Sequence, residues 1–277
     1  MNREQRQQLA RFTLDALETG RYPADSGREV NIEAWQRAAH HGSLLYRPAD
    51  VDALGQDLGV APPDAASAEV RVYAATTLQA ARALSREYGR VGVLNFASAR
   101  NPGGGFLGGS QAQEESLARS SGLYPCIAQF TEMYRHNAHL NGLYSDYLIY
   151  SPGVPVLRDD AGRWLEEPYR IDVVTAPAVN AGALRRNSPE LLPALVPTMR
   201  RRIRLVLGAA ARHGCEALVL GAWGCGVFGN DPAQMAGLFA EALQEPGIRR
   251  RFRHLDFAIF DPKPPHPTLR AFEQAFN

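Results

Sequence analysis

Lysine is almost absent from this 277-residue chain: Lys263 is the only lysine among 30 basic residues, and all the others are arginine. The skew is typical of a GC-rich genome, and the planar guanidinium also suits bidentate phosphate recognition. Acidic residues number 29, so the formal net charge is only +1. Bulk charge therefore argues neither for nor against a nucleic-acid partner, and we expect no direct DNA binding.

Cysteine is also scarce. Cys126, Cys215 and Cys225 form no CxxC pair, which excludes a disulfide framework or zinc knuckle and favours a reducing cytoplasm. The seven histidines show no HExxH or other metal spacing, so we expect neither a metal nor a cofactor. The sequence has no apolar run long enough to span a membrane, and its charged N-terminus lacks the apolar core of a signal peptide. We expect a cytoplasmic protein with no membrane partner.

What the chain does contain is an alternation of strand and helix patterns after about residue 69. Before that, one helix pattern stops at Gly20 and a second, short one begins at Asn31. Six apolar or β-branched runs then predict strands at 70–75, 91–97, 146–152, 170–178, 216–223 and 254–261. The helical patterns between them end at Gly89, Gly214 and Gly247. This alternation predicts an α/β sandwich with a mostly parallel or mixed central sheet.

We expect a single domain in three parts: a helical extension over 1–68, an α/β core over 69–261 and a last helix over 262–277. The proline-rich DPKPPHP at 261–267 is a short rigid connector to that last helix. The sequence shows no internal repeat, low-complexity tract or interdomain linker. A monomer is expected.

Two glycine-rich loops each follow a predicted strand: NPGGGFLGGS at 101–110 and GAWGCGVFGNDP at 221–232. Glycines let backbone N–H groups approach a phosphate closely, and a following helix N-terminus favours an anion. Ligands of such sheets bind beyond the carboxyl ends of the strands. Two such loops after buried strands favour phosphate binding over a pair of ordinary tight turns.

Each loop also contains a formal GxGxxG, which makes a dinucleotide-binding unit an alternative. The surrounding sequence does not fit a dinucleotide-binding unit, because neither loop is followed about 20 residues later by a strand that ends in an acidic residue. Asp261 ends a strand that comes later than this pattern requires. A P-loop is excluded more firmly, since neither loop ends in Gly-Lys-Ser/Thr.

The first loop leads into Gln113, Glu114 and Glu115. By themselves, adjacent glutamates are typical of the first turn of a surface helix, where the dipole favours them, and Ser110 and Gln113 have capping-box spacing. Beside a phosphate loop, however, a carboxylic acid can act as a general acid. Neighbours on a helix diverge by roughly 100°, so the two carboxylates cannot easily flank one bond. We expect divided roles, one carboxylate holding a sugar and the other handling protons.

The spacing of GGG, seven residues and then QEE resembles the signature of poly(ADP-ribose) glycohydrolases. The surrounding VLNFASARNPGGGFLGGSQAQEESLARSSGLY at 93–124 resembles the bacterial, macrodomain-type branch of that family, and the second glycine loop is similar to the diphosphate loop of macrodomains. The resemblance extends over roughly residues 69–261, and more loosely over the N-terminal helices. It implies a three-layer α/β/α macrodomain and hydrolysis of the ribose–ribose O-glycosidic bond in poly(ADP-ribose), mainly from chain ends.

The same resemblance implies poly(ADP-ribose) and ADP-ribosylated proteins as substrates, ADP-ribose as the product, and a role in a DNA damage response. Glu115 would protonate the departing ribose hydroxyl and later activate water, while Glu114 would orient the ribose. No metal would be needed, because the substrate diphosphate can stabilise an oxocarbenium-like centre. The other implied contacts are Gln113, Asn101, Gly103, Gly104, Gly105, Gly224, Cys225, Gly226, Val227, Phe228, Gly229 and Asn230.

One departure from the macrodomain pattern is Asn95-Phe96-Ala97-Ser98, where many macrodomains have Asn-Ala-Ala-Asn. Ser98 thus replaces an asparagine that often contacts the distal ribose, and Asn101 is a candidate to compensate. Thr77 is a candidate N-cap of its helix or a ligand contact. Asp261 is a candidate adenine acceptor or a turn aspartate before proline.

Arginines cluster at 200–204 and at 249–253. Either cluster could dock a polyanion, but we favour a solvated or salt-bridged face. Cys225 is interpreted as a packing residue and not as a nucleophile. Three functions stay in competition: a poly(ADP-ribose) glycohydrolase, a non-catalytic ADP-ribose-binding module, and a hydrolase of single protein-linked ADP-ribose. The QEE motif favours the first over the second.

Overall fold

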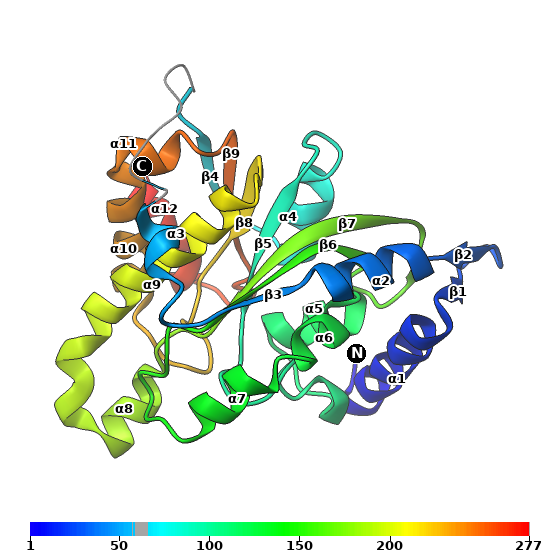
Figure 1. Ribbon diagram of the computed structural model, residues 1–277, viewed down its shortest axis with the longest axis horizontal. Helices are drawn as coiled ribbons and strands as arrows, with labels where there is room; N and C mark the ends of the chain where they lie inside the picture. The colour runs from blue at the N-terminus through cyan, green and yellow to red at the C-terminus, as the bar shows by residue number, and fades with distance from the viewer. Residues whose placement is uncertain (57, 59–65, 277) are drawn as a thin grey trace.

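The computed structural model describes residues 1–56, 58 and 66–276 (Figure 1). In this part of the chain the centre is a seven-stranded sheet of order β3-β6-β7-β5-β8-β9-β4. Strand β6 is antiparallel to both of its neighbours, whereas β7, β5, β8, β9 and β4 are parallel, which confirms the predicted mixed sheet. The strands are β3 (Leu44–Tyr46), β4 (Glu69–Ala74), β5 (Val91–Phe96), β6 (Leu148–Arg158), β7 (Trp164–Ala176), β8 (Ala217–Leu220) and β9 (His254–Ile259).

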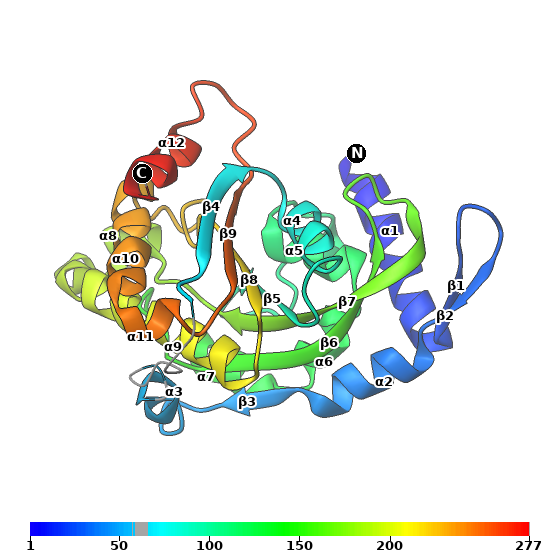
Figure 2. The same cartoon turned by 90° about the horizontal axis from the view of Figure 1, so that it is seen from above.

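Helices cover both faces of this sheet (Figures 1 and 2). Side chains alternate along β5, so Val91 and Val93 join one core and Leu94 joins the other. The first core includes residues of α2 (Glu33–Gly42), α4 (Thr77–Leu84), α5 (Gln113–Ser120), α6 (Leu123–Ala128) and α7 (Thr131–Ala138). The second includes residues of α3 (Asp52–Gln56), α8 (Ala181–Asn187), α9 (Leu195–Arg212), α10 (Pro232–Gln244), α11 (Pro246–Arg249) and α12 (Pro267–Phe276). The α/β/α arrangement is therefore confirmed.

The segment before residue 69 is less helical than predicted. Helix α1 (Arg3–Thr19) ends at Gly20, whose φ of 71° explains why glycine stops it. It is followed by a hairpin of β1 (Arg21–Pro23) and β2 (Glu29–Asn31), and β3 then joins the edge of the main sheet. The prediction missed these strands because three residues are too few to show a period of two. Residues 57 and 59–65 of this predicted extension lie outside the described residues.

Two predicted boundaries were also wrong. Strands β6 and β7 form a hairpin much longer than the predicted runs, since an irregular register between Ser151 and Val154 and the charged start of β7 hide the alternation. The predicted helical pattern that ends at Gly214 is divided into a 3₁₀ segment, Pro189–Ala194, and α9, because Pro193 cannot donate a helical hydrogen bond. Among the helices of the described ranges, none combines the length and apolarity that crossing a membrane requires.

Candidate active site

A cavity of about 960 Å³ lies at the carboxyl ends of the parallel strands. Its walls come from the start of α4, the loop after β5, helix α5 and the loop after β8. The turn between β6 and β7, Met1 and Leu9 at the N-terminal helix, and Phe260 and Thr268 on either side of the connector to α12 complete the lining. The predicted site residues that line it are Thr77, Ser98, Asn101, Gly104, Gly105, Gln113, Glu114, Glu115, Gly224, Cys225, Gly226, Val227 and Phe228. The structure thus brings both glycine loops and both glutamates into one cavity.

Gln113 fixes the start of α5 to the end of β5. Phe96 N–H donates to Gln113 Oε1 at 2.9 Å, and Gln113 Nε2 donates to the Leu94 carbonyl at 2.8 Å and to Thr77 Oγ1 at 3.2 Å. The side-chain amide therefore continues the hydrogen bonding of β5 where the strand ends. It sets the position of the two glutamates that follow, and its polar atoms are occupied by protein partners.

Glu114 is the buried member of the pair, with 2% of its surface exposed. Its carboxylate accepts from Ser98 N–H at 2.6 Å and from Asn95 Nδ2 at 3.2 Å. Burial raises the pKa of Glu114 to about 8, and the neighbouring Glu115 charge adds to the rise against these hydrogen bonds. The raised pKa favours the neutral form of Glu114 in the unliganded protein, and a neutral carboxyl can both donate to and accept from a sugar hydroxyl.

This pKa makes stability depend on pH. The folded-state pKa of Glu114, about 8, exceeds its ordinary value of 4.5, so folding retains a proton that the unfolded chain loses between these pH values. The contribution of Glu114 to stability therefore falls as pH rises from 4.5 through 8. We predict that Glu114→Gln raises the unfolding midpoint relative to wild type by at least about 2–4 °C at pH 9, with a smaller gain at pH 5.

Thermal unfolding followed by circular dichroism at the two pH values measures this difference. The exposed Glu190→Gln in the segment before α9 is the matched control and should show no pH-dependent gain. An equal shift for Glu114→Gln at both pH values would show that Glu114 is ionised in the folded protein.

Glu115, the next residue, is half-buried on the cavity side of α5. Gly105 N–H donates to its Oε1 at 3.0 Å, and this is its only hydrogen bond to the part of the chain that the structure describes. One oxygen is thus held by the glycine loop, and the other is not engaged by these residues. Such an arrangement fixes the carboxyl group and leaves it able to exchange a proton with a bound ligand.

The first glycine loop owes its path to its glycines. Gly103 and Gly104 have φ of 71° and 58°, in the left-handed region that residues with a Cβ rarely adopt. A Cβ on Gly104 would clash with Glu115 Oε1, and one on Gly103 would press on the Phe106 ring. The loop and the catalytic candidate are therefore packed directly against each other, although Gly103 itself does not line the cavity.

The second glycine loop is braced from behind by Asn230. Its Nδ2 donates to the carbonyls of Val179, at 2.8 Å, and of Gly224, at 3.0 Å, and its side chain is buried. Gly224 has φ of 77°, and a Cβ there would press on Asn230 and Ala178. Gly229 and Asn230, which the sequence grouped with the ligand contacts, do not line the cavity; Asn230 supports the residues that do.

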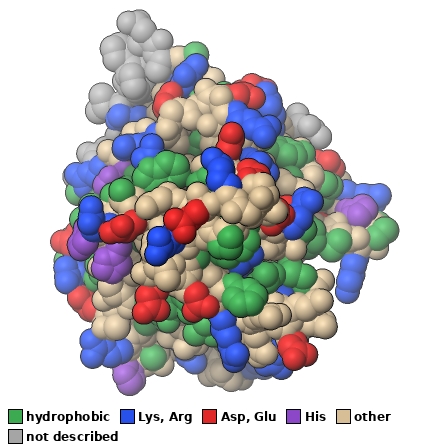
Figure 3. Space-filling view, turned by 90° about the vertical axis from the view of Figure 1, so that its right-hand side faces the viewer, with side chains coloured by type: hydrophobic (Ala, Val, Ile, Leu, Met, Phe, Trp, Pro, Cys, Tyr) green, Lys and Arg blue, Asp and Glu red, His purple; other side chains and the backbone are tan. Residues whose placement is uncertain are grey.

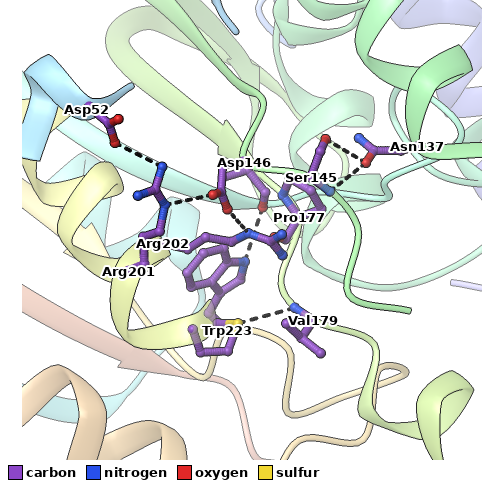
Figure 4. A network of polar contacts seen from close by, with 11 residues as sticks. Asp52, Asn137, Ser145, Asp146, Pro177, Val179, Arg201, Arg202 and Trp223 are labelled. Atoms are coloured by element: carbon purple, nitrogen blue, oxygen red, sulfur yellow. Dashed lines mark hydrogen bonds and ion pairs between the residues drawn. The ribbon is translucent and has the colours of Figure 1, made fainter. Parts of the chain in front are cut away.

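A network of polar contacts joins α9 and the second glycine loop to the end of β7 (Figure 4). Arg202 donates to Asp146 Oδ1 at 2.8 Å and to the Pro177 carbonyl at 3.2 Å, while Arg201 holds the other Asp146 oxygen. Trp223, which lines the cavity, donates from Nε1 to the Ala176 carbonyl at 3.2 Å. Arg200 and Arg204 pair with acidic residues of α10 and its C-terminal cap. The arginine cluster at 200–204 is therefore a salt-bridged face, as we favoured.

The structure corrects two helix-cap predictions and decides between the two interpretations of Asp261. The N-cap of α4 is Thr76, whose side chain accepts from Gln79 N–H, and Thr77 is the first helical residue. Ser110 does not cap α5, because the helix begins after Ala112 without a side-chain cap. Asp261 lies beyond the end of β9 and accepts from Thr268 N–H at 2.8 Å, so its carboxylate caps α12 and does not line the cavity.

The structure also agrees with the interpretation of Cys225. Burial raises the pKa of the Cys225 thiol to about 12, which is consistent with a packing residue. No group of histidine, cysteine, aspartate and glutamate within the described ranges is arranged to hold a metal ion. Sequence reasoning did not single out several cavity residues, because their types carry no motif. They are Thr76, Phe96, Ala178, Trp223, Phe260 and Thr268.

An α/β/α sandwich with two glycine loops and a glutamate pair at the strand ends defines a macrodomain-type enzyme site. The family model for the catalytic domain of microbial-type PARG, or poly(ADP-ribose) glycohydrolase, matches residues 10–159. The chain belongs to this family. No curated protein matches the chain.

Solved structures give the same assignment. Poly(ADP-ribose) glycohydrolase from Thermomonospora curvata is 48% identical, with a TM-score of 0.94, over 99% of this chain and 100% of that one. The same enzyme bound to the inhibitor ADP-HPD gives 46% identity and a TM-score of 0.90 over 98% and 99% of the two chains. The Deinococcus radiodurans enzyme in complex with ADP-ribose gives 45% identity and a TM-score of 0.84 over 90% and 99%.

Proposed function

We propose that this protein hydrolyses the ribose–ribose O-glycosidic bonds of poly(ADP-ribose) and releases ADP-ribose. The observation that carries the proposal is the placement of Glu114 and Glu115 in one cavity with both glycine loops. The Glu115 carboxyl group is fixed by Gly105 N–H of the first glycine loop, an arrangement that binding of ADP-ribose alone does not require. The ADP-ribose complex of the Deinococcus radiodurans relative supports the choice of ligand.

In this proposal the second glycine loop binds the diphosphate. Its residues Gly224–Phe228 line the cavity, and loop N–H groups with a following helix N-terminus suit an anion. Gly104 and Gly105 lie against the distal ribose, and Phe228 packs beside it, with its ring 6.0 Å from that of Tyr144. Binding then places the scissile bond near Glu115.

Glu115 serves as the general acid and base. Protonated Glu115 gives its proton to the departing ribose oxygen as the C1–O bond breaks, and the resulting carboxylate then takes a proton from the water that attacks C1. The positive charge that develops at C1 is stabilised by the nearby diphosphate. Neutral Glu114 holds the ribose hydroxyls so that C1 faces Glu115.

The proposed enzyme acts mainly at the ends of the polymer chain. Phe260, which is 70% exposed, and Thr268 border the cavity where the chain leads into α12, and this wall favours a terminal ADP-ribose unit over an internal one. The protein acts as a monomer in the cytoplasm, within a DNA damage response, on poly(ADP-ribose), including the polymer that ADP-ribosylated proteins carry.

Incubation with two substrates tests the reaction. We expect the protein to release ADP-ribose from purified poly(ADP-ribose), with free ADP-ribose and few short oligomers among the earliest products. We expect no release from a mono-ADP-ribosylated protein. Release from the second substrate alone would make the protein a mono-ADP-ribosyl hydrolase, and early oligomers would contradict action at chain ends.

A further inference from the structure

Side chains donate hydrogen bonds to four consecutive residues, 108–111, of the seven that separate the two halves of the catalytic motif. Arg3 Nε donates to the Gly108 carbonyl at 2.8 Å, and Gln7 Nε2 donates to the same oxygen at 3.2 Å. Arg6 Nε donates to the Gly109 carbonyl at 2.7 Å. These three donors are on the first two turns of α1, a hundred residues earlier in the chain.

The other two positions are held from α5. Arg119 Nη1 donates to the Ser110 carbonyl at 2.6 Å, and Nη2 donates to Gln111 Oε1 at 3.0 Å. Arg119 is only 3% exposed and lies one helical turn after Glu115. Helix α1 secures this arginine as well, because Thr13 Oγ1 donates to the Arg119 carbonyl at 2.6 Å.

Helix α1 also packs closely against this loop. Gly109 has φ of 74°, and a Cβ there would clash with the Arg3 carbonyl. Ala10 of α1 packs with Ala118 of α5 and with Phe106 of the loop in a small buried cluster. Helix α1 also lies beside the β6–β7 hairpin, so it is itself fixed to the sheet (Figure 2).

The loop needs support from α1 and α5 because its own glycine-rich sequence does little to hold one backbone conformation. Five of the seven residues in Gly103–Gly109 are glycine, and glycine loses more backbone entropy on ordering than any other residue. Glu115 in turn takes its hydrogen bond from this loop, through Gly105 N–H. A shift of the loop would therefore move the carboxyl group that the reaction uses.

We propose that α1 is a positioning element of the active site, in which Arg3, Arg6 and Gln7 hold the catalytic loop so that Glu115 is correctly placed. The inference rests on the proposed function. Neither Arg3 nor Arg6 forms an ion pair with a described residue, so the loop carbonyls are their principal partners. On the face that carries α1, basic and acidic side chains are interspersed, which does not favour polyanion docking as their role (Figure 3).

The test is the double variant Arg3→Met/Arg6→Met, with kcat, KM and ADP-ribose affinity measured separately. We expect kcat on poly(ADP-ribose) to fall about 10- to 100-fold, because a displacement of about 1 Å costs that much. We expect the Kd for ADP-ribose to change less than about threefold, since the diphosphate loop is untouched. Arg3→Lys/Arg6→Lys should recover most of kcat, because a lysine ammonium also donates to a single carbonyl.

Arg11→Met is the matched control: Arg11 is exposed on the same helix and has no hydrogen bond or ion pair to the described residues. It should retain wild-type kcat. Wild-type kcat in the double methionine variant, or equal losses in kcat and ADP-ribose affinity, would overturn the inference. If the double variant unfolds, Gln7→Met and amide hydrogen exchange of 108–115 replace it; unchanged exchange and kcat would likewise overturn the inference. An inactive wild type would instead refute the proposed function.

Discussion

We expect that replacing Glu115 by alanine will lower the rate of ADP-ribose release by about 10²- to 10⁴-fold, the range that a positioned general acid and base contributes. Glu115 has one oxygen held by Gly105 N–H and lines the cavity, and in the proposed mechanism it is the carboxyl group that transfers the proton. ADP-ribose binding should survive, because the residues of the second glycine loop are unchanged. The variant therefore separates catalysis from binding.

The measurement pairs initial rates on poly(ADP-ribose) with calorimetric titration of ADP-ribose. Glu115→Gln should lose activity to a similar extent, since an amide keeps the size and cannot transfer the proton. Exposed Glu190→Ala should behave as wild type and serves as the matched control. Full activity in Glu115→Ala would remove Glu115 from the mechanism, whatever its affinity for ADP-ribose.

Replacing Gly104 by alanine should cost about 10²-fold in kcat, although the substitution adds only one methyl group and changes no charge. Two features combine here. Gly104 has φ of 58°, which disfavours a residue with a Cβ, and that Cβ would clash with Glu115 Oε1. The carboxylate or the loop must move, and either movement breaks the geometry that Gly105 N–H imposes.

The Gly104→Ala experiment compares kcat, the ADP-ribose Kd and the unfolding midpoint. Gly237→Ala in α10 is the matched control, because no atom lies within contact distance of its added Cβ and alanine is the better helix former. We expect Gly237→Ala to keep wild-type kcat. A Gly104→Ala protein with wild-type kcat would show that the loop and Glu115 are not rigidly coupled.

The sequence predicted the central strands and the two motifs of the candidate site. The six predicted strands exist because buried β-branched runs such as VGVLNF have few alternatives in a folded chain. The two glycine loops and the QEE triplet were found because phosphate approach and proton transfer require particular residue types at short spacing. Their convergence on one cavity follows from parallel strands, whose carboxyl ends meet at one edge of the sheet.

The sequence could not predict hydrogen bonds between residues that are far apart in the chain. Gln113 was grouped with ligand contacts, but its amide is occupied by β5 and Thr77, a pairing that only the fold creates. Asn230 belongs to the loop motif yet faces inward to Val179. The first helix appeared to be an extension, because nothing in Arg3 or Arg6 reveals a carbonyl acceptor a hundred residues away. Short-range spacing identifies chemistry, whereas long-range hydrogen bonds determine which residues support it.

The most direct test of the central claim is the yield of ADP-ribose per protein molecule. Wild-type protein is mixed with an excess of purified poly(ADP-ribose), and free ADP-ribose is quantified by chromatography over time. The account predicts many molecules of ADP-ribose released per protein, with progressive loss of polymer. Saturable binding of polymer or ADP-ribose, with no free ADP-ribose beyond that of a protein-free control, would contradict it and make the protein a binding module.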